Sequence, residues 1–172
     1  MMIQTFRRPA MAAAFAAAIA AIAASPAADA ATSRTHLIAS TAICEAPLPQ
    51  YGLPLKKGPF AITNQGTTGV FLSCALPTDS YGGIQSGNVN VVVRAGASAA
   101  TVNCTMASGH NQWGVHYQTT AITVAANGSG TVSWANVNKE ESDGTYAFSC
   151  VLPPGYMLEA VTLREESAAG NL

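Results

Sequence analysis

The chain has 172 residues, and only 10% of them are charged, against about 25% in a typical soluble domain. The formal net charge is −1, and serine, threonine, asparagine and glutamine stand where charges would be expected. After the first thirty positions, Lys56-Lys57 is the only pair of adjacent basic residues, so the clustered lysine and arginine of a nucleic-acid-binding protein are missing.

Residues 1–30 have the three parts of an export signal. Arg7 and Arg8 precede an uncharged apolar run of 14 residues, and Ala28-Asp29-Ala30 then fits the small-x-small cleavage rule. A membrane-spanning helix needs about 20 apolar residues, so this run is short for one. We predict a signal peptide over residues 1–30 and a secreted or periplasmic protein with no membrane span after cleavage. An anchor that stays attached is the alternative.

Residues 31–59 read as an N-terminal lead-in followed by a loop. A short strand is predicted at His36–Ile43, where apolar and β-branched residues gather. Residues 46–59 hold four prolines and two glycines, and proline removes a ladder donor and breaks helices. We therefore expect this stretch to be an extended loop.

Residues 60–166 carry a series of β-strand signals separated by turns. The predicted strands are Thr68–Leu76, Asn88–Arg94, Ala100–Met106, Val115–Ala125, Thr131–Val137, Thr145–Leu152 and Met157–Arg164. The crossover helices that a parallel sheet needs are missing from the pattern. The sequence therefore predicts an all-β fold, an antiparallel β-sandwich of about 7–8 strands, with residues 167–172 as a flexible C-terminus.

Two of the predicted turns have residues that suit a tight chain reversal. Gly96 lies between two β-rich runs, and Asn127-Gly128-Ser129-Gly130 contains residues that tolerate a positive φ. We expect each to close a β-hairpin, with Ala100–Met106 and Thr131–Val137 as the returning arms.

Four cysteines lie after the signal peptide: Cys44, Cys74, Cys104 and Cys150. An even number in an exported chain indicates two disulfides, and without a CxxC motif neither a zinc cluster nor a thioredoxin-like redox site is expected. Of the three possible pairings we favour Cys44–Cys74 with Cys104–Cys150. The other two pairings, and free buried thiols, remain alternatives.

A cysteine-centred motif occurs twice, as FLSCALP before residue 78 and as AFSCVLP before residue 154. Strand alternation places each cysteine on the same face as apolar residues two positions away, so we expect core strands with inward sulfurs. Ser73 and Ser149 then point the other way.

With Ser149–Pro154 and the later Leu163-Arg164-Glu165, the repeated motif resembles small, uncharacterised secreted proteins of Gram-negative bacteria. The resemblance implies a disulfide-linked β-domain and transfers no catalytic residue.

The segment Ser108–Gln118 has the composition most typical of a binding site. It holds His110, Asn111, Gln112, Trp113, His116 and Tyr117 between two predicted strands. An exposed aromatic ring can stack on a sugar, and histidine or amide groups can bond its hydroxyls, so this segment predicts a ligand-binding site, with glycan or cell-envelope material as its ligand. Alternatively, Trp113 and Tyr117 are core residues at a loop edge.

A hydrolase or metal-dependent enzyme using His110 and His116 is the second hypothesis. A third ligand would come from Asp79, Asp143 or a glutamate, and neither HExxH nor GxSxG occurs. We therefore assign no catalytic residue, metal or cofactor.

A structural, assembly or inhibitor protein of the periplasm is the third hypothesis, because open edges of a low-charge sheet can accept a partner strand. Our main prediction is a non-catalytic binding or interaction protein with a glycan or protein partner.

Overall fold

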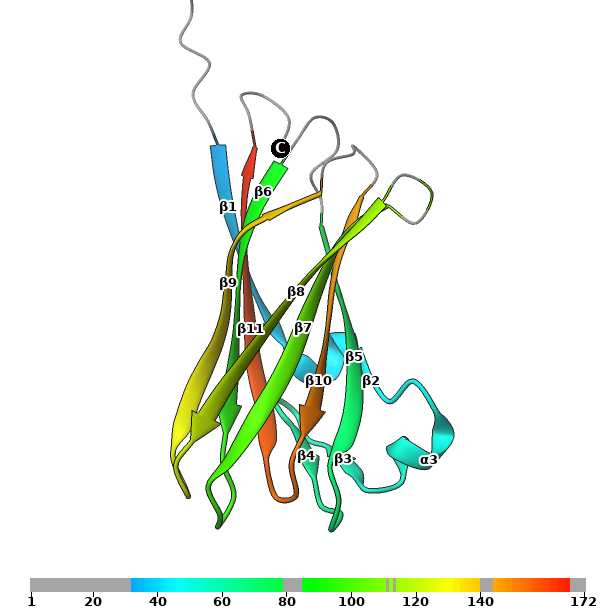
Figure 1. Cartoon of the computed structure of the whole chain (residues 1–172), viewed down its shortest axis with the longest axis vertical. Coiled ribbons are helices and arrows are strands. Elements are labelled where there is room, and N and C mark those ends of the chain that lie inside the picture. The colour runs from blue at the N-terminus through cyan, green and yellow to red at the C-terminus, as the bar shows by residue number, and fades with distance from the viewer. Residues whose placement is uncertain (1–31, 79–84, 111, 113, 140–143, 168–172) are drawn as a thin grey trace, which may run out of the picture.

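The computed structural model describes residues 32–78, 85–110, 112, 114–139 and 144–167, and all strand pairs in this part are antiparallel (Figure 1). A six-stranded sheet has the order β3–β4–β11–β6–β9, and β1 also pairs with β11. Its strands are β1 (Thr32–Ala39), β3 (Leu55–Lys57), β4 (Ile62–Asn64), β6 (Gln85–Arg94), β9 (Ser129–Asn138) and β11 (Met157–Ser167).

A five-stranded sheet packs against it in the order β2–β5–β10–β7–β8. Its strands are β2 (Cys44–Glu45), β5 (Val70–Leu76), β7 (Ala100–His110), β8 (Gly114–Val124) and β10 (Thr145–Leu152). Two single-turn helices, α2 (Ser40–Ile43) and α3 (Pro49–Gly52), lie in the N-terminal segment. Within the described residues, no helix has the length and apolar character needed to cross a bilayer.

The predicted all-β antiparallel sandwich is confirmed, and the eight strands predicted from the sequence are the eight longest of the structure. The short strands β2, β3 and β4 were not predicted. The strand expected at His36–Ile43 is wrong at its end, because β1 stops at Ala39 and α2 follows. The expected loop over residues 46–59 contains α3 and β3, and the lead-in 31–59 supplies β1, β2 and β3 to the two sheets. The predicted signal peptide and residues 168–172 lie outside the described residues.

The core is one apolar cluster between the two sheets. Strand β5 shows the alternation that builds it, since every second side chain from Val70 to Leu76 is buried and the ones between are exposed. The six-stranded sheet contributes a row of valines from β6, Val89, Val91 and Val93. Across the core, the rings of Trp134 and Phe148 lie 6.0 Å apart between centroids, which joins the two sheets.

The two predicted hairpins are wrong, although their turns exist. Strands β6 and β7 belong to different sheets, and so do β8 and β9. The turns instead carry the chain from one sheet to the other at the same end of the sandwich, where Ala95 N–H donates to the Gly128 carbonyl and Asn127 N–H to the Gly96 carbonyl, both at 2.8 Å (Figure 1). Asn127 has a φ of 56°, as expected for a turn asparagine. Turn residues reverse the chain but do not select the strand with which the next strand pairs.

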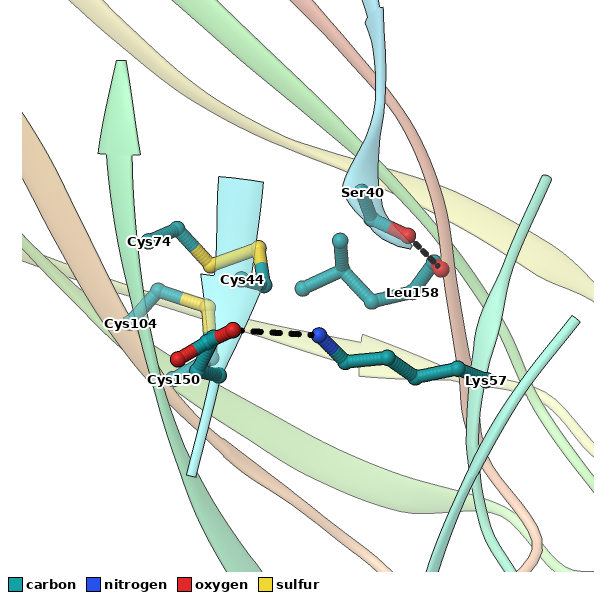
Figure 2. The surroundings of a disulfide bond; sticks show 8 residues. Ser40, Cys44, Lys57, Cys74, Cys104, Cys150 and Leu158 are labelled. Atoms are coloured by element: carbon teal, nitrogen blue, oxygen red, sulfur yellow. Dashed lines mark hydrogen bonds and ion pairs between the residues drawn. A yellow bond between two sulfur atoms is a disulfide. The ribbon is translucent and has the colours of Figure 1, made fainter. Parts of the chain in front are cut away.

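Both predicted disulfides, Cys44–Cys74 and Cys104–Cys150, are confirmed. Each joins two directly opposite residues of neighbouring strands in the five-stranded sheet, with Cα atoms 4.0 Å and 4.1 Å apart. Figure 2 shows the two bridges with the nearby Ser40 hydroxyl, which donates to the Leu158 carbonyl at 2.6 Å. The bridges therefore link β2 to β5 and β7 to β10 inside one sheet.

The two copies of the cysteine motif are antiparallel neighbours, β5 and β10, with all their sulfurs inward as predicted. Ser73 and Ser149 stand directly opposite each other on the other face of that sheet.

Candidate functional site

The segment 108–118 forms the end of a hairpin made by β7 and β8. His110 is the last residue of β7, Gln112 lies in the turn, and His116 and Tyr117 lie on β8. The Gln112 N–H donates to His110 Nδ1 at 3.2 Å. Asn111 and Trp113 lie outside the described residues.

The hairpin separates two of the predicted site residues. His116 stands opposite Ser108, whose side chain is buried between the sheets, whereas Tyr117 stands opposite Ala107 on the other face. Tyr117 is 71% exposed, so the alternative that places it in the core is wrong. Within the described residues no group of three or more His, Cys, Asp or Glu side chains could hold a metal ion, and Asp79 and Asp143 lie outside that part of the chain.

Tyr117 belongs to a larger surface, which we call the outer face of the five-stranded sheet. Because side chains alternate along β5, β10, β7 and β8, those at the odd-numbered positions of these strands lie on this face. On these four strands the side chains of this face are uncharged: Phe71, Ser73, Ala75, Thr101, Asn103, Thr105, Ala107, Tyr117, Thr119, Ala121, Thr123, Thr145, Ala147, Ser149 and Val151. On the edge strand β2, the exposed Glu45 stands opposite Ser73 on the same face, and its carboxylate lies 3.6 Å from Lys57 Nζ.

The strand register arranges these side chains in rows that run across the strands. One row of hydroxyls reads Ser73–Ser149–Thr105–Thr119. Strands are spaced about 4.8 Å apart, so the row spans about 14 Å. Within this row, the hydroxyl oxygens of Thr105 and Thr119 lie 3.1 Å apart, which is a hydrogen-bonding distance.

Apolar rows lie on both sides of the hydroxyl row. One reads Ala75–Ala147–Ala107–Tyr117 and ends at the exposed tyrosine. The other reads Phe71–Val151–Asn103–Ala121, with the polar Asn103 among apolar residues. Phe71 and Val151 are 38% and 42% exposed. The outer face thus combines a line of hydrogen-bonding groups with flat apolar patches.

An open depression of about 710 Å³ borders this face where β5 meets the α2–β2 segment. Its lining is mostly small and apolar: Ala42, Ile43, Glu45, Ala46, Pro47, Ser73, Ala75, Leu76 and Pro77. Ser73 and Ala75 belong to both the depression and the outer face. A ligand lying on the face can therefore continue into the depression.

This surface could not be recognised in any single segment of the sequence, because its residues are spread over four strands. Its signal is the presence of uncharged, mostly small or hydroxyl residues at every second position of four strands, as in TVNCTM and AFSCVL. That signal indicates a surface only when the strands are known to be neighbours.

A second polar group, the Glu165 cluster, lies inside the sandwich and comprises Glu165, Thr78, Lys139 and His36. The Thr78 hydroxyl donates to Glu165 Oε1 at 2.6 Å, and the Lys139 ammonium donates to Thr78 at 3.0 Å. His36 Nε2 lies 3.3 Å from the other carboxylate oxygen. Glu165 and Lys139 are fully buried, so the cluster joins four segments of the chain rather than facing a ligand.

Tyr146 lies beside this cluster, with the Lys139 ammonium 5.7 Å from its ring centroid. Its hydroxyl donates to the Val137 carbonyl at 3.2 Å. Burial, and secondly the negative charge of Glu165, raise the pKa of Tyr146 well above its usual value.

No protein-family model and no curated protein matches the chain. Among solved structures it is similar to a Podospora anserina GH26-CBM35 β-(1,4)-mannanase, at 12% identity and a TM-score of 0.40, over 84% of this chain and 29% of that one. It is similar to a xylan-binding domain of CBM22, at 17% identity and a TM-score of 0.40, over 87% and 92% of the two chains.

A Clostridium thermocellum family 11 carbohydrate-binding module matches at 10% identity and a TM-score of 0.35, over 83% of this chain and 90% of that one. Of the mannanase, by contrast, the match covers only 29%, so this chain spans less than a third of that protein's length. All three TM-scores lie below 0.5, and we base no functional argument on these likenesses.

Proposed function

We propose that this protein is an exported, non-catalytic binding protein and that the outer face of the five-stranded sheet binds a neutral polysaccharide. The observation that carries the proposal is the uncharged character of this face across β5, β10, β7 and β8. An anionic polymer would find no lysine or arginine on these four strands, and the carboxylate beside them, Glu45 on β2, is ion-paired with Lys57 at 3.6 Å.

A sugar chain has the chemistry that these rows complement. A pyranose ring has an apolar C–H face and a rim of hydroxyls. Phe71 and Tyr117 supply flat apolar contact, while the row from Ser73 to Thr119 supplies donors and acceptors. The predicted binding residue Tyr117 is part of this site, and His116 lies on the opposite face of its strand.

Export is supported by the two disulfides, which are typical of oxidising compartments. The predicted signal peptide over residues 1–30 would direct export of the protein to the periplasm or to the extracellular medium.

Binding should be measured by titration calorimetry and affinity electrophoresis against neutral polymers such as β-glucan, mannan and xylan, with anionic alginate as the comparison. We expect binding to at least one neutral polymer and none to alginate. Ser149→Lys places a long cation in the centre of the hydroxyl row, and we expect it to weaken binding by at least about tenfold, or about 1.4 kcal/mol.

The matched control is Ser133→Lys, which makes the same change at an exposed position on β9 of the other sheet. It should leave affinity within about twofold of the unaltered protein. Equal affinity of the two lysine variants, or no binding to any neutral polymer, would contradict the proposal.

A further inference from the structure

The N-terminal strand β1 is attached to the sandwich mainly through its backbone. It pairs with β11 over its full length of 8 residues, from Thr32 to Ala39. None of its described side chains is fully buried, and only Ile38 is among the residues that pack against the core. Its partner β11 buries four side chains of its own. Most of the core packing of this strand pair therefore comes from β11, and little of it is lost if β1 leaves.

The place that β1 occupies beside β11 nevertheless has a specific chemistry. Glu165 on β11 is 0% exposed, and His36 of β1 lies 3.3 Å from its carboxylate. In the register Arg34 stands directly opposite Glu165, and Ile38 stands opposite Val161. A strand in this place therefore needs polar or basic residues near the buried carboxylate, as Arg34 and His36 are in β1, and an apolar residue further along, as Ile38 is.

The chain changes character immediately after β1. Ser40 is buried and its hydroxyl is bonded to the Leu158 carbonyl, and Cys44 is fixed to Cys74 by a disulfide. The segment that begins at Ser40 is thus held to both sheets, whereas β1 is held by its ladder with β11, by the His36–Glu165 contact and by Ile38. A change of backbone direction at Ala39 would withdraw β1, with its contacts from Ile38 and His36, while the Ser40 hydrogen bond and the Cys44–Cys74 disulfide hold the following residues in place.

From these observations we propose that β1 exchanges between two copies of this chain, so that the β1 of each copy pairs with the β11 of the other. The exchanged dimer repeats every contact of the monomer and needs no new complementary surface, because both copies supply the same strand to the same place. Since association depends on concentration, the dimer should increase with protein concentration.

The test traps the strand with a new disulfide. Leu37 and Thr162 stand directly opposite each other in the β1–β11 register, and Leu37 is exposed. Leu37→Cys/Thr162→Cys is prepared in unlabelled and ¹⁵N-labelled forms, mixed at high concentration, oxidised and analysed by non-reducing mass spectrometry. We expect a species of doubled mass in which position 37 of one isotopic form is bridged to position 162 of the other.

The control pair is Lys56→Cys/Thr63→Cys, which are directly opposite in the short hairpin of β3 and β4 and should bridge only within a chain. If mixed-isotope bridges are no more frequent for the β1 pair than for this control, the exchange does not occur. A second control oxidises the Leu37→Cys/Thr162→Cys protein while dilute and then concentrates it. This locked form should remain monomeric by light scattering, and dimerisation equal to that of the unaltered protein would assign the dimer to another surface and overturn the proposal.

Discussion

At the scale of single residues, the most unusual feature is a charged cluster inside a chain that has few charges. Glu165 and Lys139 are both fully buried, and Thr78 links them by accepting from the ammonium and donating to the carboxylate. Burying an ion costs several kcal/mol unless partners replace its water. The cluster therefore depends on all its members being present, which ties β11 to the segments that follow β5 and β9.

Tyr146 gives a prediction about alkaline pH. Its pKa is raised in the folded protein by burial and by Glu165, whereas in the unfolded chain it is about 10. Above pH 10 the unfolded state loses the Tyr146 proton and the folded state keeps it, so the free energy of unfolding should fall as pH rises from about 10. Urea titrations at pH 8 to 11 should show a shallower decline for Tyr146→Phe.

Tyr117→Phe serves as the control, because it removes a hydroxyl from an exposed side chain. The slope above pH 10 should match that of the unaltered protein. If Tyr146→Phe also leaves the slope unchanged, the burial of Tyr146 does not contribute to alkaline unfolding.

At the scale of elements, the five-stranded sheet is the reinforced half of the sandwich. Its two disulfides join β2 to β5 and β7 to β10, and the ladder between β5 and β10 connects the two joined pairs. This rigid sheet also carries the outer face on its other side. The covalent links therefore hold the hydroxyl row in register before a ligand binds. This favours the binding of an extended ligand, because the protein loses little conformational entropy on binding.

Removing each disulfide should destabilise the protein by a different amount. The chain-entropy relation gives about 4 kcal/mol for the Cys104–Cys150 loop, whose sequence separation is 46, and about 0.4 kcal/mol less for Cys44–Cys74, whose separation is 30. Urea unfolding of the two double-alanine variants measures both losses. A larger loss for the Cys44–Cys74 variant would show that local packing, rather than loop length, decides the order.

At the scale of the whole molecule, the chain passes repeatedly between the sheets. Among the described strands from β5 onward, β7 and β8 are the only consecutive ones that pair with each other. The turns between β6 and β7, β8 and β9, and β10 and β11 meet at one end of the sandwich, where Tyr156 places its hydroxyl within 3.2 Å of the carbonyls of Ala100 and Val124 and within 3.1 Å of that of Ser98. This end is therefore a packed joint between the sheets.

The close approach of two turns at this joint gives a prediction for glycine. A Cβ on Gly96 would lie 2.8 Å from the Gly155 carbonyl oxygen, and Gly155 has a φ of 75°. Because backbone must move to relieve this overlap, Gly96→Ala should lower the free energy of unfolding by about 1–3 kcal/mol.

Gly52→Ala is the matched change in α3, where a new Cβ would be 3.8 Å from its nearest neighbour, the Ala46 Cβ, and should cost nothing. Thermal and urea unfolding compare the two variants. Equal free energies of unfolding for the Gly96 variant and the unaltered protein would contradict the prediction, because the backbone at this joint would then move to accept the new Cβ without loss of stability.

Local patterns in the sequence were sufficient for the strand content and the inward cysteines. The favoured disulfide pairing remained one of three until the structure placed β2 beside β5 and β7 beside β10. Alternation with period two is a property of each strand alone, so the faces of FLSCALP and AFSCVLP could be assigned without knowing their neighbours. The expected hairpins failed because Gly96 and Asn127 determine where the chain turns, and not which strand pairs with the next one.

The tertiary structure alone decided which strands became neighbours, and with them the functional surface. Ladder partners are selected by the burial of apolar side chains that are distant in sequence, and this cooperative choice leaves no mark on any single segment. The same choice aligned Ser73, Ser149, Thr105 and Thr119 into one row and enclosed Glu165 behind β1. The sequence by itself determined which face each residue takes, and only the folded sheet determined which residues share that face.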